Sequence, residues 1–517
     1  MKLITKSVLV ALLLAAQSSL AGEYLVKYKN TSALNKIAAL QTESFGLQMT
    51  GMHEPGQLVK VQISGKNEPK TLAKLMTDAN VEYVVPNFKL YAVSAPVDAD
   101  ALKEQYALVK VNAAQAWKRA GNKGSKNVLL AVIDTGVDYR HKNLAPNAVP
   151  GYDFRDNDAD PMDQTSAQNP GHGTHCAGIV GATGLVEGGI SGLSPEVSIM
   201  PLRFLGADGS GSLEGGIKAI DYAIEKGVQV ISASWGASVP LSTAKPLVEA
   251  IERAEKAGII FVTAAANDGK NNDKTDVYPA NAGTPNMITV AASNSSDAKP
   301  SWSNYGKAKV HVAAPGDAIM STVPGDKYSN MSGTSMATPL VAGLVAFLKA
   351  QDPSLTGAEI RALIQTTGSK VSIETACNCR IDAFQAVDTL LSKKAWMVPA
   401  AATLAKDATM QVTLKNATAT AFESTNPSVL TVDASGNVKA VANGTAKIKA
   451  TYAGGAVESL DFNVGAAASN PGNPPSDPGN PPSDPGNPPG GDECPIQDPQ
   501  MCQILCQIMP DAPWCNK

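Results

Sequence analysis

The chain has 517 residues, 44% of them hydrophobic, so it is too long for one ordinary domain and can fill at least one large core. Its formal net charge of −4 gives no basic surface, which excludes nucleic acid as an expected partner. Composition and charge say little more about function, which therefore depends on motifs and their spacing.

Residues 1–21 have the features of a secretory signal peptide. Two lysines precede an apolar stretch over residues 8–16, and the small residues Ser19 and Ala21 suit cleavage before Gly22. This stretch is too short to cross a bilayer, and no other stretch in the sequence is long and apolar enough to do so. We therefore expect a secreted, extracellular protein without a membrane span.

Residues 22–98 predict a small α+β domain. Its strand-like runs are EYLVKY, QLVKVQI and VEYVVP, with residues 49–53 as a further strand. Its helix-like runs are SALNKIAALQTESF and EPKTLAKLMTDA. The order of these elements suits one small unit built from a sheet and helices.

Residues 99–393 alternate apolar runs with amphipathic helices, the pattern of βαβ units around a parallel sheet. Four apolar runs end in polar or glycine residues, at Asp134, residues 209–211, residues 234–236 and Asn267. In an open parallel sheet, ligands bind beyond the carboxyl ends of the strands. These four clusters are therefore expected to line one crevice.

Two of the five histidines, His172 and His175, lie in the segment GHGTHCAG. Their spacing could suit a metal, but the segment has no glutamate, and its one cysteine, Cys176, does not complete a zinc set. A histidine titrates near neutrality and can take the proton of a serine hydroxyl when a carboxylate fixes its far nitrogen. Asp134, at the end of a buried strand, is placed for that role. The pattern thus predicts a general base at His172 and a packed neighbour at His175.

The segment GTSMATP places Ser335 at the start of a helix. Pro339 has no N–H for the carbonyl of Ser335 and is expected in a first turn, so the helix must begin within about one turn of Ser335. The following run, LVAGLVAFLKA, is apolar almost all round, as expected of a fully buried helix. At the positive end of such a helix, Ser335 is either a nucleophile or a simple helix cap.

An acidic loop, DFRDNDADPMD, lies between Asp134 and His172. Its carboxylates can bind Ca²⁺ through oxygen ligands, and the alternative is a solvated acidic loop. The candidate calcium ligands are Asp156, Asp158, Asp160 and Asp163.

The chain has seven cysteines, and export makes disulfides possible. Four of them fall within residues 494–517, which predicts a disulfide-linked tail whose pairing the sequence leaves open. Cys377 and Cys379 can pair with each other or with partners elsewhere. The odd total leaves at least one thiol over, and Cys176, in an apolar segment, is predicted to be buried and inert.

The C-terminal part of the chain changes character twice. Residues 396–465 have no clear helix, and short alternating runs such as SVLTVD and NVKAVA predict a β-sandwich. Residues 466–493 contain a seven-residue repeat rich in proline, glycine and asparagine, which is typical of an extended, semi-rigid linker.

Three segments, AVIDTGVD, GHGTHCAG and MSGTSMATP, resemble the signature motifs of the subtilisin-like serine proteases, in the order Asp, His, Ser. The resemblance covers about residues 105–392. It implies that Asp134 orients the imidazole of His172, that His172 acts as general base and then as general acid, and that Ser335 attacks the peptide carbonyl. The segment AAAN resembles the oxyanion segment of this family, which makes Asn267 the side-chain donor beside the Ser335 backbone N–H.

The same resemblance assigns the walls of the crevice. LGADGSG resembles the edge strand that pairs with an extended substrate, and backbone pairing of this kind predicts tolerant cleavage. The implied substrate-binding residues are Gly209, Ser210 and Gly211 on the edge strand, Ser234, Trp235 and Gly236 on one wall of the primary pocket, and Ala264, Ala265 and Ala266 on the other. The family commonly has glycine at the place of Ala266 and a smaller aliphatic residue at the place of Trp235. Both departures are expected to alter the pocket.

The flanking regions also resemble parts of such enzymes. Residues 22–98 resemble the inhibitory propeptide, a ferredoxin-like α+β unit, which would block the crevice until the enzyme cuts itself between residues 91 and 101. Residues 396–465 are similar to bacterial immunoglobulin-like domains. Related proteases often hold structural calcium, which implies a Ca²⁺ site in the acidic loop.

The resemblance thus implies an α/β fold, a subtilisin-like parallel sheet flanked by helices, between a small α+β propeptide and a β-sandwich domain. The expected protein is a secreted, monomeric serine endopeptidase, made as a self-processed zymogen, that cuts protein or peptide substrates with broad preference. One alternative is a catalytically silent surface-binding protein that acts through its immunoglobulin-like domain and tail. A serine esterase or lipase would need a G-x-S-x-G elbow, which GTSMA lacks.

Overall fold

A computed structural model of the chain describes residues 22–29, 46–64, 67–92 and 105–465. These residues fall into two compact units, with the boundary between Phe88 and Lys89. The expected signal peptide, the helix-like run SALNKIAALQTESF, most of the expected self-cleavage segment, the linker and the cysteine-rich tail lie outside the described residues.

The first unit is a four-stranded antiparallel sheet with one helix. Its elements are β1 (Gly22–Tyr28), β2 (Leu47–His53), β3 (Leu58–Ile63), α3 (Glu68–Met76) and β4 (Val81–Pro86), and the strand order is β2-β3-β1-β4. Alternate residues of β3, Val59 and Val61, are buried in one core with Val26 of β1 and Leu72 of α3. The predicted strands and the second predicted helix of this unit are confirmed.

The second unit contains a nine-stranded sheet with the order β17-β18-β14-β13-β12-β10-β6-β8-β7. The strands are β6 (Leu129–Asp134), β7 (Tyr152–Asp153), β8 (Ser198–Arg203), β10 (Val230–Ala233), β12 (Ile260–Ala264), β13 (Met287–Ser293), β14 (Val312–Pro315), β17 (Ser369–Lys370) and β18 (Cys379–Arg380). Every pairing is parallel except that of β17 with β18. All residues of β10 and β12 are buried, as expected of a parallel sheet that is covered on both faces.

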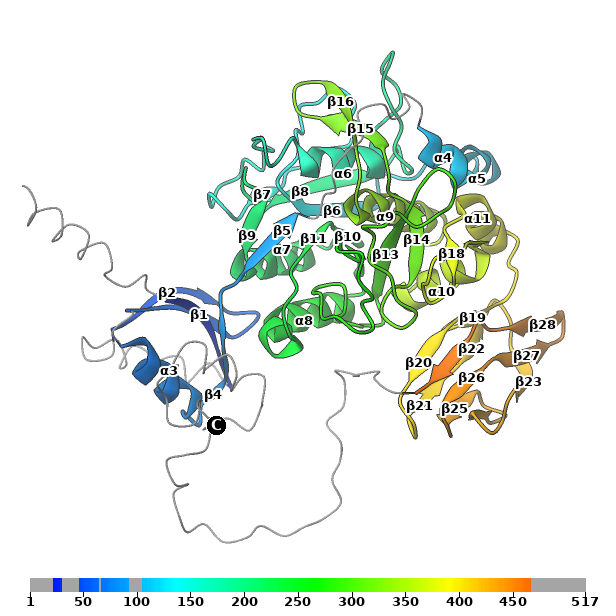
Figure 1. Ribbon diagram of the computed structural model, residues 1–517. Helices are drawn as coiled ribbons and strands as arrows, with labels where there is room; N and C mark the ends of the chain where they lie inside the picture. The colour runs from blue at the N-terminus through cyan, green and yellow to red at the C-terminus, as the bar shows by residue number, and fades with distance from the viewer. Residues whose placement is uncertain (1–21, 30–45, 65–66, 93–104, 466–517) are drawn as a thin grey trace, which may run out of the picture. The chain divides into compact units, whose positions relative to one another are not determined.

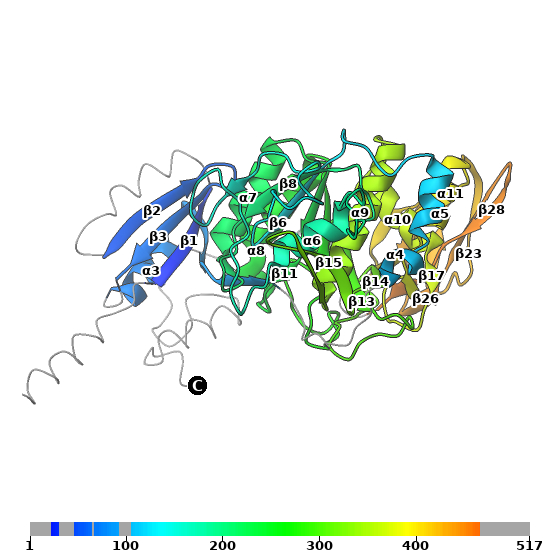
Figure 2. The same cartoon turned by 90° about the horizontal axis from the view of Figure 1, so that it is seen from above.

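Helices flank this sheet, as the alternating sequence pattern predicts (Figure 1 and Figure 2). They are α4 (Tyr106–Lys110), α5 (Ala113–Ala120), α6 (His172–Gly181), α7 (Leu213–Glu225), α8 (Leu241–Lys256), α9 (Thr334–Gln351), α10 (Gly357–Thr367) and α11 (Ala383–Leu391). Helix α9 packs on α6 and on β10, β12 and β13. All of α9 except its last two residues is buried, which explains its almost wholly apolar sequence.

The sheet brings the carboxyl ends of β6, β10 and β12 side by side. From β6 the chain continues to β8 on one side and later enters β10 on the other side, so the strand order reverses at β6. Such a switch point leaves a crevice at the carboxyl ends of the strands. Asp134 ends β6, Ser234 follows β10, and Asn267 lies shortly after β12. These residues therefore share the edge of the sheet that the sequence predicts.

The C-terminal domain is a sandwich of short strands, as predicted. The strands are β19 (Trp396–Val398), β20 (Ala402–Leu404), β21 (Thr409–Gln411), β22 (Thr413–Lys415), β23 (Ala419–Ser424), β24 (Leu430–Val432), β25 (Asn437–Ala440), β26 (Gly444–Ala446), β27 (Ile448–Tyr452), β28 (Gly455–Glu458) and β29 (Phe462–Val464). They form the sheets β19-β22, β20-β29-β26, β21-β25-β24 and β23-β27-β28. Leu430, Ile448 and Phe462 belong to the single apolar core of this domain.

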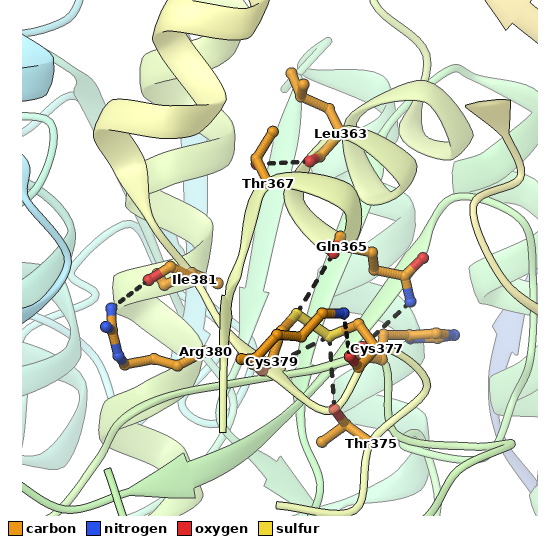
Figure 3. The surroundings of a disulfide bond; sticks show 10 residues. Leu363, Gln365, Thr367, Thr375, Cys377, Cys379, Arg380 and Ile381 are labelled. Atoms are coloured by element: carbon orange, nitrogen blue, oxygen red, sulfur yellow. Dashed lines mark hydrogen bonds between the residues drawn. A yellow bond between two sulfur atoms is a disulfide. The ribbon is translucent and has the colours of Figure 1, made fainter. Parts of the chain in front are cut away.

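Cys377 and Cys379 form a disulfide with each other, which decides between the two pairings that the sequence leaves open. Figure 3 shows the bridge between Thr375 and Gln365. The Thr375 hydroxyl lies 3.6 Å from the Cys377 sulfur, and the Gln365 carbonyl oxygen lies 3.6 Å from the Cys379 sulfur. Cys176 is a buried free thiol, as predicted.

Candidate active site

Asp134 and His172 form a buried hydrogen-bonded pair. Asp134 is the last residue of β6, and His172 is the first residue of α6. The His172 Nδ1 and Asp134 Oδ1 atoms are 2.7 Å apart, and both residues are almost fully buried. A Cβ on Gly173 would lie 2.1 Å from the Gly136 carbonyl oxygen, so glycine is needed for the helix to approach the strand this closely.

The surroundings of His172 favour its protonated form. Burial lowers the pKa of His172, but the Asp134 carboxylate at Nδ1 and, beside it, Cys176 together raise this pKa well above the ordinary 6.5. The opposite ring atom, Nε2, is buried and has no hydrogen-bond partner. An imidazole with a carboxylate on one nitrogen and an unused second nitrogen can accept a proton from a serine hydroxyl.

Ser335 is the second residue of α9, so the helix begins beside it, as predicted. Its hydroxyl donates a hydrogen bond to the Ser234 carbonyl oxygen at 3.0 Å. Cys176 connects this residue to the histidine, because its sulfur lies 3.4 Å from the Ser335 carbonyl oxygen and 4.0 Å from His172 Nδ1. The structure therefore brings the serine and the Asp134–His172 pair together.

Pro339 lies inside α9 and not in its first turn, so the expectation about its place in the helix is wrong. As predicted from its chemistry, it has no N–H to give to the carbonyl of Ser335. The Ser234 hydroxyl donates to this carbonyl instead, at 2.9 Å. Ser234 and Ser335 are thus joined by two hydrogen bonds. The Ser234 hydroxyl supplies the hydrogen bond that the Ser335 carbonyl would otherwise receive from a backbone N–H at position 339.

The side-chain amide of Asn267 is oriented by Thr334, the residue before the serine. Its Oδ1 accepts hydrogen bonds from the Thr334 backbone N–H and from the Thr334 hydroxyl, both at 2.9 Å. Its Nδ2 atom is buried and has no hydrogen-bond partner. An oriented N–H donor with no partner, close to the start of α9, can stabilise a negative oxygen that develops during a reaction.

Ala266 has a backbone φ of 90°, in the left-handed region that favours glycine. Its N–H donates to the Thr334 hydroxyl at 3.2 Å. Thr334 therefore fixes both Ala266 and Asn267. The glycine that the resemblance implies at this place would adopt the same backbone conformation without strain. Alanine at position 266 therefore lowers the stability of the folded chain locally.

A three-stranded sheet lies along the crevice. It consists of β9 (Ser210–Ser212), β5 (Lys89–Ala92) and β11 (Trp235–Gly236), with β5 in the middle and antiparallel to both neighbours (Figure 1). The Ala92 backbone N–H donates to the Gly209 carbonyl at 2.9 Å. Leu90 is fully buried whereas Tyr91 is 51% exposed, so alternate side chains of β5 point to opposite sides. A strand of the chain itself thus occupies the edges that the sequence assigns to substrate.

Trp235 contributes its backbone to this small sheet and its side chain to the interior. The indole is fully buried, and its Nε1–H donates to the Ile133 carbonyl at 2.7 Å. The ring meets Phe204 edge-on, with ring centroids 4.9 Å apart. The indole is therefore fixed against β6.

The three alanines expected on the opposite wall have different packing neighbours. Ala264 ends β12, the Ala265 methyl group belongs to an apolar cluster with Ala291, and Ala266 belongs to another cluster with Val277. All three are buried. The peptide bond between Tyr278 and Pro279 near this wall is cis, an isomer that sequence alone does not reveal.

The carboxylates that the sequence assigns to calcium go to separate partners. Asp156 pairs with Arg203 at 2.6 Å, and Asp160 accepts a hydrogen bond from the Tyr139 hydroxyl at 2.8 Å. Asp158 accepts the Asp160 backbone N–H at 2.8 Å. Within the described part of the chain, no three of the four assigned carboxylates bring their oxygens close enough to share an ion. As a set, these residues do not fit a calcium site.

The fourth of these residues, Asp163, joins the two segments that carry the Asp134–His172 pair. It accepts a hydrogen bond from the Thr135 hydroxyl at 2.9 Å, and from the Thr174 N–H and hydroxyl at 2.9 and 2.6 Å. Asn169 adds a further hydrogen bond at 3.1 Å. Burial raises the pKa of Asp163 to about 6. We call Asp163 with Thr135, Thr174 and Asn169 the Asp163 clamp.

Sequence reasoning missed the Asp163 clamp and the role of Thr334. Both depend on threonines within the quoted motifs: Thr135 in AVIDTGVD, Thr174 in GHGTHCAG and Thr334 in GTSMATP. A threonine within two residues of each reactive residue is the signal that could have found them, because a buried hydroxyl needs a hydrogen-bond partner.

His175 is a buried packed neighbour, as predicted. Its Nε2 lies 3.0 Å from the Ser329 carbonyl oxygen, and burial lowers the pKa of His175 to about 3. Burial also raises the pKa of the Cys176 thiol. The ligand atoms of Asp134, His172 and Cys176 lie within 4.8 Å of one another, but the hydrogen bond between the first two already engages two of these atoms.

Two family models match separate parts of the chain. The model described as the subtilase family matches residues 125–379, a range that includes β6, α6 and the start of α9. The model of the bacterial Ig-like domain (group 2) matches residues 395–458, which include most strands of the sandwich. In the part of the chain that the structure describes, no helix has the length and apolar character of a membrane span.

Several characterised proteins align with the central part of the chain. The thermophilic serine proteinase of Bacillus sp. (strain AK1) is 41% identical over 292 residues, which are 56% of this chain and 68% of that protein. Thermitase of Thermoactinomyces vulgaris is 41% identical over 277 residues, 54% of this chain and 92% of thermitase. Subtilisin E of Bacillus subtilis (strain 168) is 32% identical over 364 residues, 69% of this chain and 87% of subtilisin E.

Proposed function

The chain belongs to the subtilase family and is a serine endopeptidase that acts on protein substrates, and we propose that its catalysis is carried out by four residues. They are Asp134, His172, Ser335 and Asn267. The observation that carries the proposal is the buried Asp134–His172 pair, whose unpartnered Nε2 belongs to a helix packed on α9. Ser335 stands at the start of α9.

In this proposal the Ser335 hydroxyl turns from the Ser234 carbonyl toward His172 Nε2. Nε2 takes the proton while Oγ attacks the peptide carbonyl carbon, and the imidazolium then gives the proton to the leaving amine. A water molecule then attacks the acyl-enzyme while His172 Nε2 takes its proton. The proton returns to Ser335 Oγ, and the second product leaves as a carboxylic acid. Asp134 holds the ring in the required tautomer and stabilises the imidazolium.

Asn267 stabilises the tetrahedral intermediate. Its Nδ2 has no partner in the resting site, so it can donate to the oxyanion without first breaking a hydrogen bond. The Ser335 backbone N–H, at the positive end of α9, is the second donor. In subtilisin, the equivalent side-chain donor contributes roughly 10²–10³ in kcat.

The enzyme is made as a zymogen in which residues 22–98 act as an intramolecular inhibitor. The support for this is β5, which pairs on both sides as an extended substrate would. Self-cleavage falls between residues 91 and 101, directly after this strand. Recognition through backbone hydrogen bonds depends on an extended chain more than on its side chains, so we expect broad substrate preference.

The remaining regions serve export and spacing. Residues 1–21 direct secretion, residues 99–393 form the peptidase domain, and residues 396–465, 466–493 and 494–517 form the immunoglobulin-like domain, the linker and the disulfide-linked tail. We expect the enzyme to act as an extracellular monomer.

The structural calcium that the resemblance implies has no fitting site in the acidic loop, because its four carboxylates do not fit one shared ion, and no step of the proposed mechanism depends on calcium. The alternative of a catalytically silent surface-binding protein is not favoured. A relic enzyme would have no reason to keep a buried Asp134–His172 pair and the unpartnered donor of Asn267.

The test compares the wild type with Ser335→Ala and with Ser296→Ala, a control at an exposed serine whose side chain takes no part in the site. Each purified full-length protein is incubated with casein and followed on a gel for several hours. Wild type and Ser296→Ala should shorten by about the propeptide and digest casein, whereas Ser335→Ala should remain whole. Digestion of casein by Ser335→Ala at the wild-type rate would refute the proposed triad.

A further inference from the structure

A cavity of about 280 Å³ lies between the peptidase domain and the immunoglobulin-like domain. Its peptidase side carries Lys307, Lys309, His311 and Arg361, and Asp461 on the other side is the one acidic residue among those that line it. Three basic side chains thus face one acidic side chain. The cavity lies at the amino end of β13, so it is separate from the reactive centre at the carboxyl ends of the strands.

Of the basic side chains of this cavity, Lys309 and Arg361 are half-buried and Lys307 is exposed. Neither Lys309 nor Arg361 forms an ion pair with another residue in the described ranges. Glu255 acts on Arg361, and Asp273 and Asp276 act on Lys309, only from beyond ion-pair distance. Burial lowers the pKa of Arg361 to about 10 and also lowers the pKa of Lys309. A negative group in the cavity would offset this loss of solvation.

Hydrogen-bond donors converge on the same space. His311 Nδ1 accepts the Thr289 backbone N–H at 2.8 Å, so the neutral ring carries its proton on Nε2. Burial lowers the pKa of His311 well below its usual value, which keeps the ring neutral. His311 Nε2 lies 3.4 Å from Arg361 Nη1, which is itself a donor. Arg361 Nη1 already donates to the Met287 and Thr284 carbonyls, at 3.0 and 3.4 Å, so the Nε2–H of His311 is the donor that remains at this point for an acceptor in the cavity.

The walls of the cavity are held in place without a ligand. Arg361 donates to the Met287 carbonyl at 3.0 Å, and Gln365, which Figure 3 labels beside the disulfide, donates to the His311 carbonyl at 3.2 Å. The domain junction is fixed at Glu359, whose carboxylate pairs with Lys415 of β22 at 2.8 Å. A preformed site of this kind loses little entropy on binding.

We propose that this cavity binds a small oxyanion, such as inorganic phosphate or a free carboxylate, between Lys309 and Arg361, and that the bound anion stabilises the docking of the immunoglobulin-like domain on the peptidase domain. Phosphate and carboxylate are the groups that a guanidinium and an ammonium recognise best. The size of the cavity suits a small anion and not a folded partner.

The experiment uses the full chain carrying Ser335→Ala, which removes self-digestion during the measurement. Calorimetric titration with sodium phosphate, and separately with N-acetylglycine, is compared with sodium chloride at equal ionic strength. Thermal unfolding is recorded in the same buffers. Lys309→Gln and Lys307→Gln alter the site, and Lys439→Gln, an exposed lysine on β25, is the matched control.

We expect saturable binding of phosphate or of N-acetylglycine, and the arm that saturates identifies the chemistry of the ligand. Saturation should raise the unfolding temperature by about 2–4 °C. Lys309→Gln should weaken binding at least about tenfold, whereas Lys439→Gln should leave it unchanged. The proposal is wrong if neither anion gives saturable heat, or if Lys309→Gln and Lys439→Gln bind the anion equally well.

Discussion

The reactive centre and the Asp163 clamp are neighbours, but they treat their buried polar atoms in opposite ways. In the centre, Asp134 Oδ2, His172 Nε2 and Asn267 Nδ2 are buried without hydrogen-bond partners. In the clamp, both oxygens of Asp163 accept hydrogen bonds. An unpartnered buried polar atom costs stability, and such atoms also occur elsewhere in the described residues, for example at Thr263 and Ser293. It is the gathering of an unpartnered carboxylate oxygen, imidazole nitrogen and amide nitrogen at one place that marks the reactive centre. Polar atoms whose hydrogen bonds are all formed, such as the Asp163 oxygens, instead hold the reactive residues in position.

The two histidines of α6 show the same contrast within one turn. Both are buried, but His172 has a carboxylate at Nδ1, which raises its pKa, whereas His175 has only a carbonyl oxygen at Nε2, and burial lowers its pKa to about 3. Burial is therefore common to both residues. The partner decides which one can act as a base.

The largest effect is expected from removal of the base. His172→Ala should lower kcat by roughly 10⁶, the loss known for this residue type in subtilisin. The variant cannot process itself, so its propeptide is removed with an added protease before the assay. A loss of less than tenfold, with an unchanged unfolding temperature, would mean that the unpartnered Nε2 does not serve the reaction.

Removal of the unpartnered donor should have the next largest effect. Asn267→Leu should lower kcat by roughly 10²–10³ and change KM little, because the hydrogen bond forms only in the transition state. Steady-state kinetics on a peptide amide separate the two constants. A raised KM with unchanged kcat would place Asn267 in substrate binding instead.

A change in the clamp should affect position and stability together. Asp163→Asn replaces an acceptor that faces several donors, and should lower the free energy of unfolding by about 1–3 kcal/mol. Displacement of the Asp134–His172 pair should lower kcat/KM by up to about 10². If this variant had the stability and the activity of the wild type, the hydrogen bonds to the Asp163 oxygens would not position the Asp134–His172 pair.

The same carboxylate gives a pH dependence with a defined sign. The pKa of Asp163 is about 6 in the folded chain and 3.8 ordinarily, so the folded chain binds this proton more tightly. Its contribution to the free energy of unfolding is therefore full below about pH 4 and is lost as the pH rises through about 6. Urea unfolding between pH 4 and 7 should show this decline in the wild type and a smaller decline in Asp163→Asn.

The pH dependence of activity tests the contrast between the histidines. His172 must be neutral to act as a base, and its pKa is raised, so kcat/KM should rise tenfold per pH unit up to a pKa above 6.5. His175 stays neutral down to about pH 3, so it should add no second step. If log kcat/KM rose on the acidic side with a slope of two per pH unit, two groups would have to lose a proton, which would contradict this assignment.

The smallest effect concerns the strained alanine. Ala266→Gly should raise the free energy of unfolding by up to about 1 kcal/mol, because glycine adopts a φ of 90° without the cost that alanine bears. Ala265→Gly, without a positive φ, is the matched control and should lower it by a similar amount. Equal losses in both variants would show that the strain at Ala266 is negligible.

The sequence predicted the sheet and the order of the reactive residues because both follow from local patterns. Fully apolar runs specify buried parallel strands, and Asp134 and Asn267 stand where such runs stop. Pro339 and the apolar run after it predicted where α9 begins. Distances and pKa directions could not be predicted, since they depend on how segments far apart in the chain meet.

Two of the expectations concern side chains whose partners are distant in the sequence. The acidic loop suggested calcium, but Asp156 pairs with Arg203, which is 47 residues away on β8, and no local pattern reveals this partner. Trp235 suggested an altered pocket wall, but its indole turns inward to the Ile133 carbonyl. In both cases a contact distant in sequence decides the role of a side chain.

One measurement tests the central claim directly, namely that the unpartnered His172 Nε2 activates Ser335. Processed wild-type enzyme is treated with a sulfonyl fluoride, in which a serine Oγ displaces fluoride, and the digest is analysed by mass spectrometry, with His172→Ala treated in parallel. We expect one adduct on the peptide that contains Ser335, in proportion to lost activity, and almost none in His172→Ala. Full inactivation without an adduct at Ser335, or equal labelling of both proteins, would contradict it.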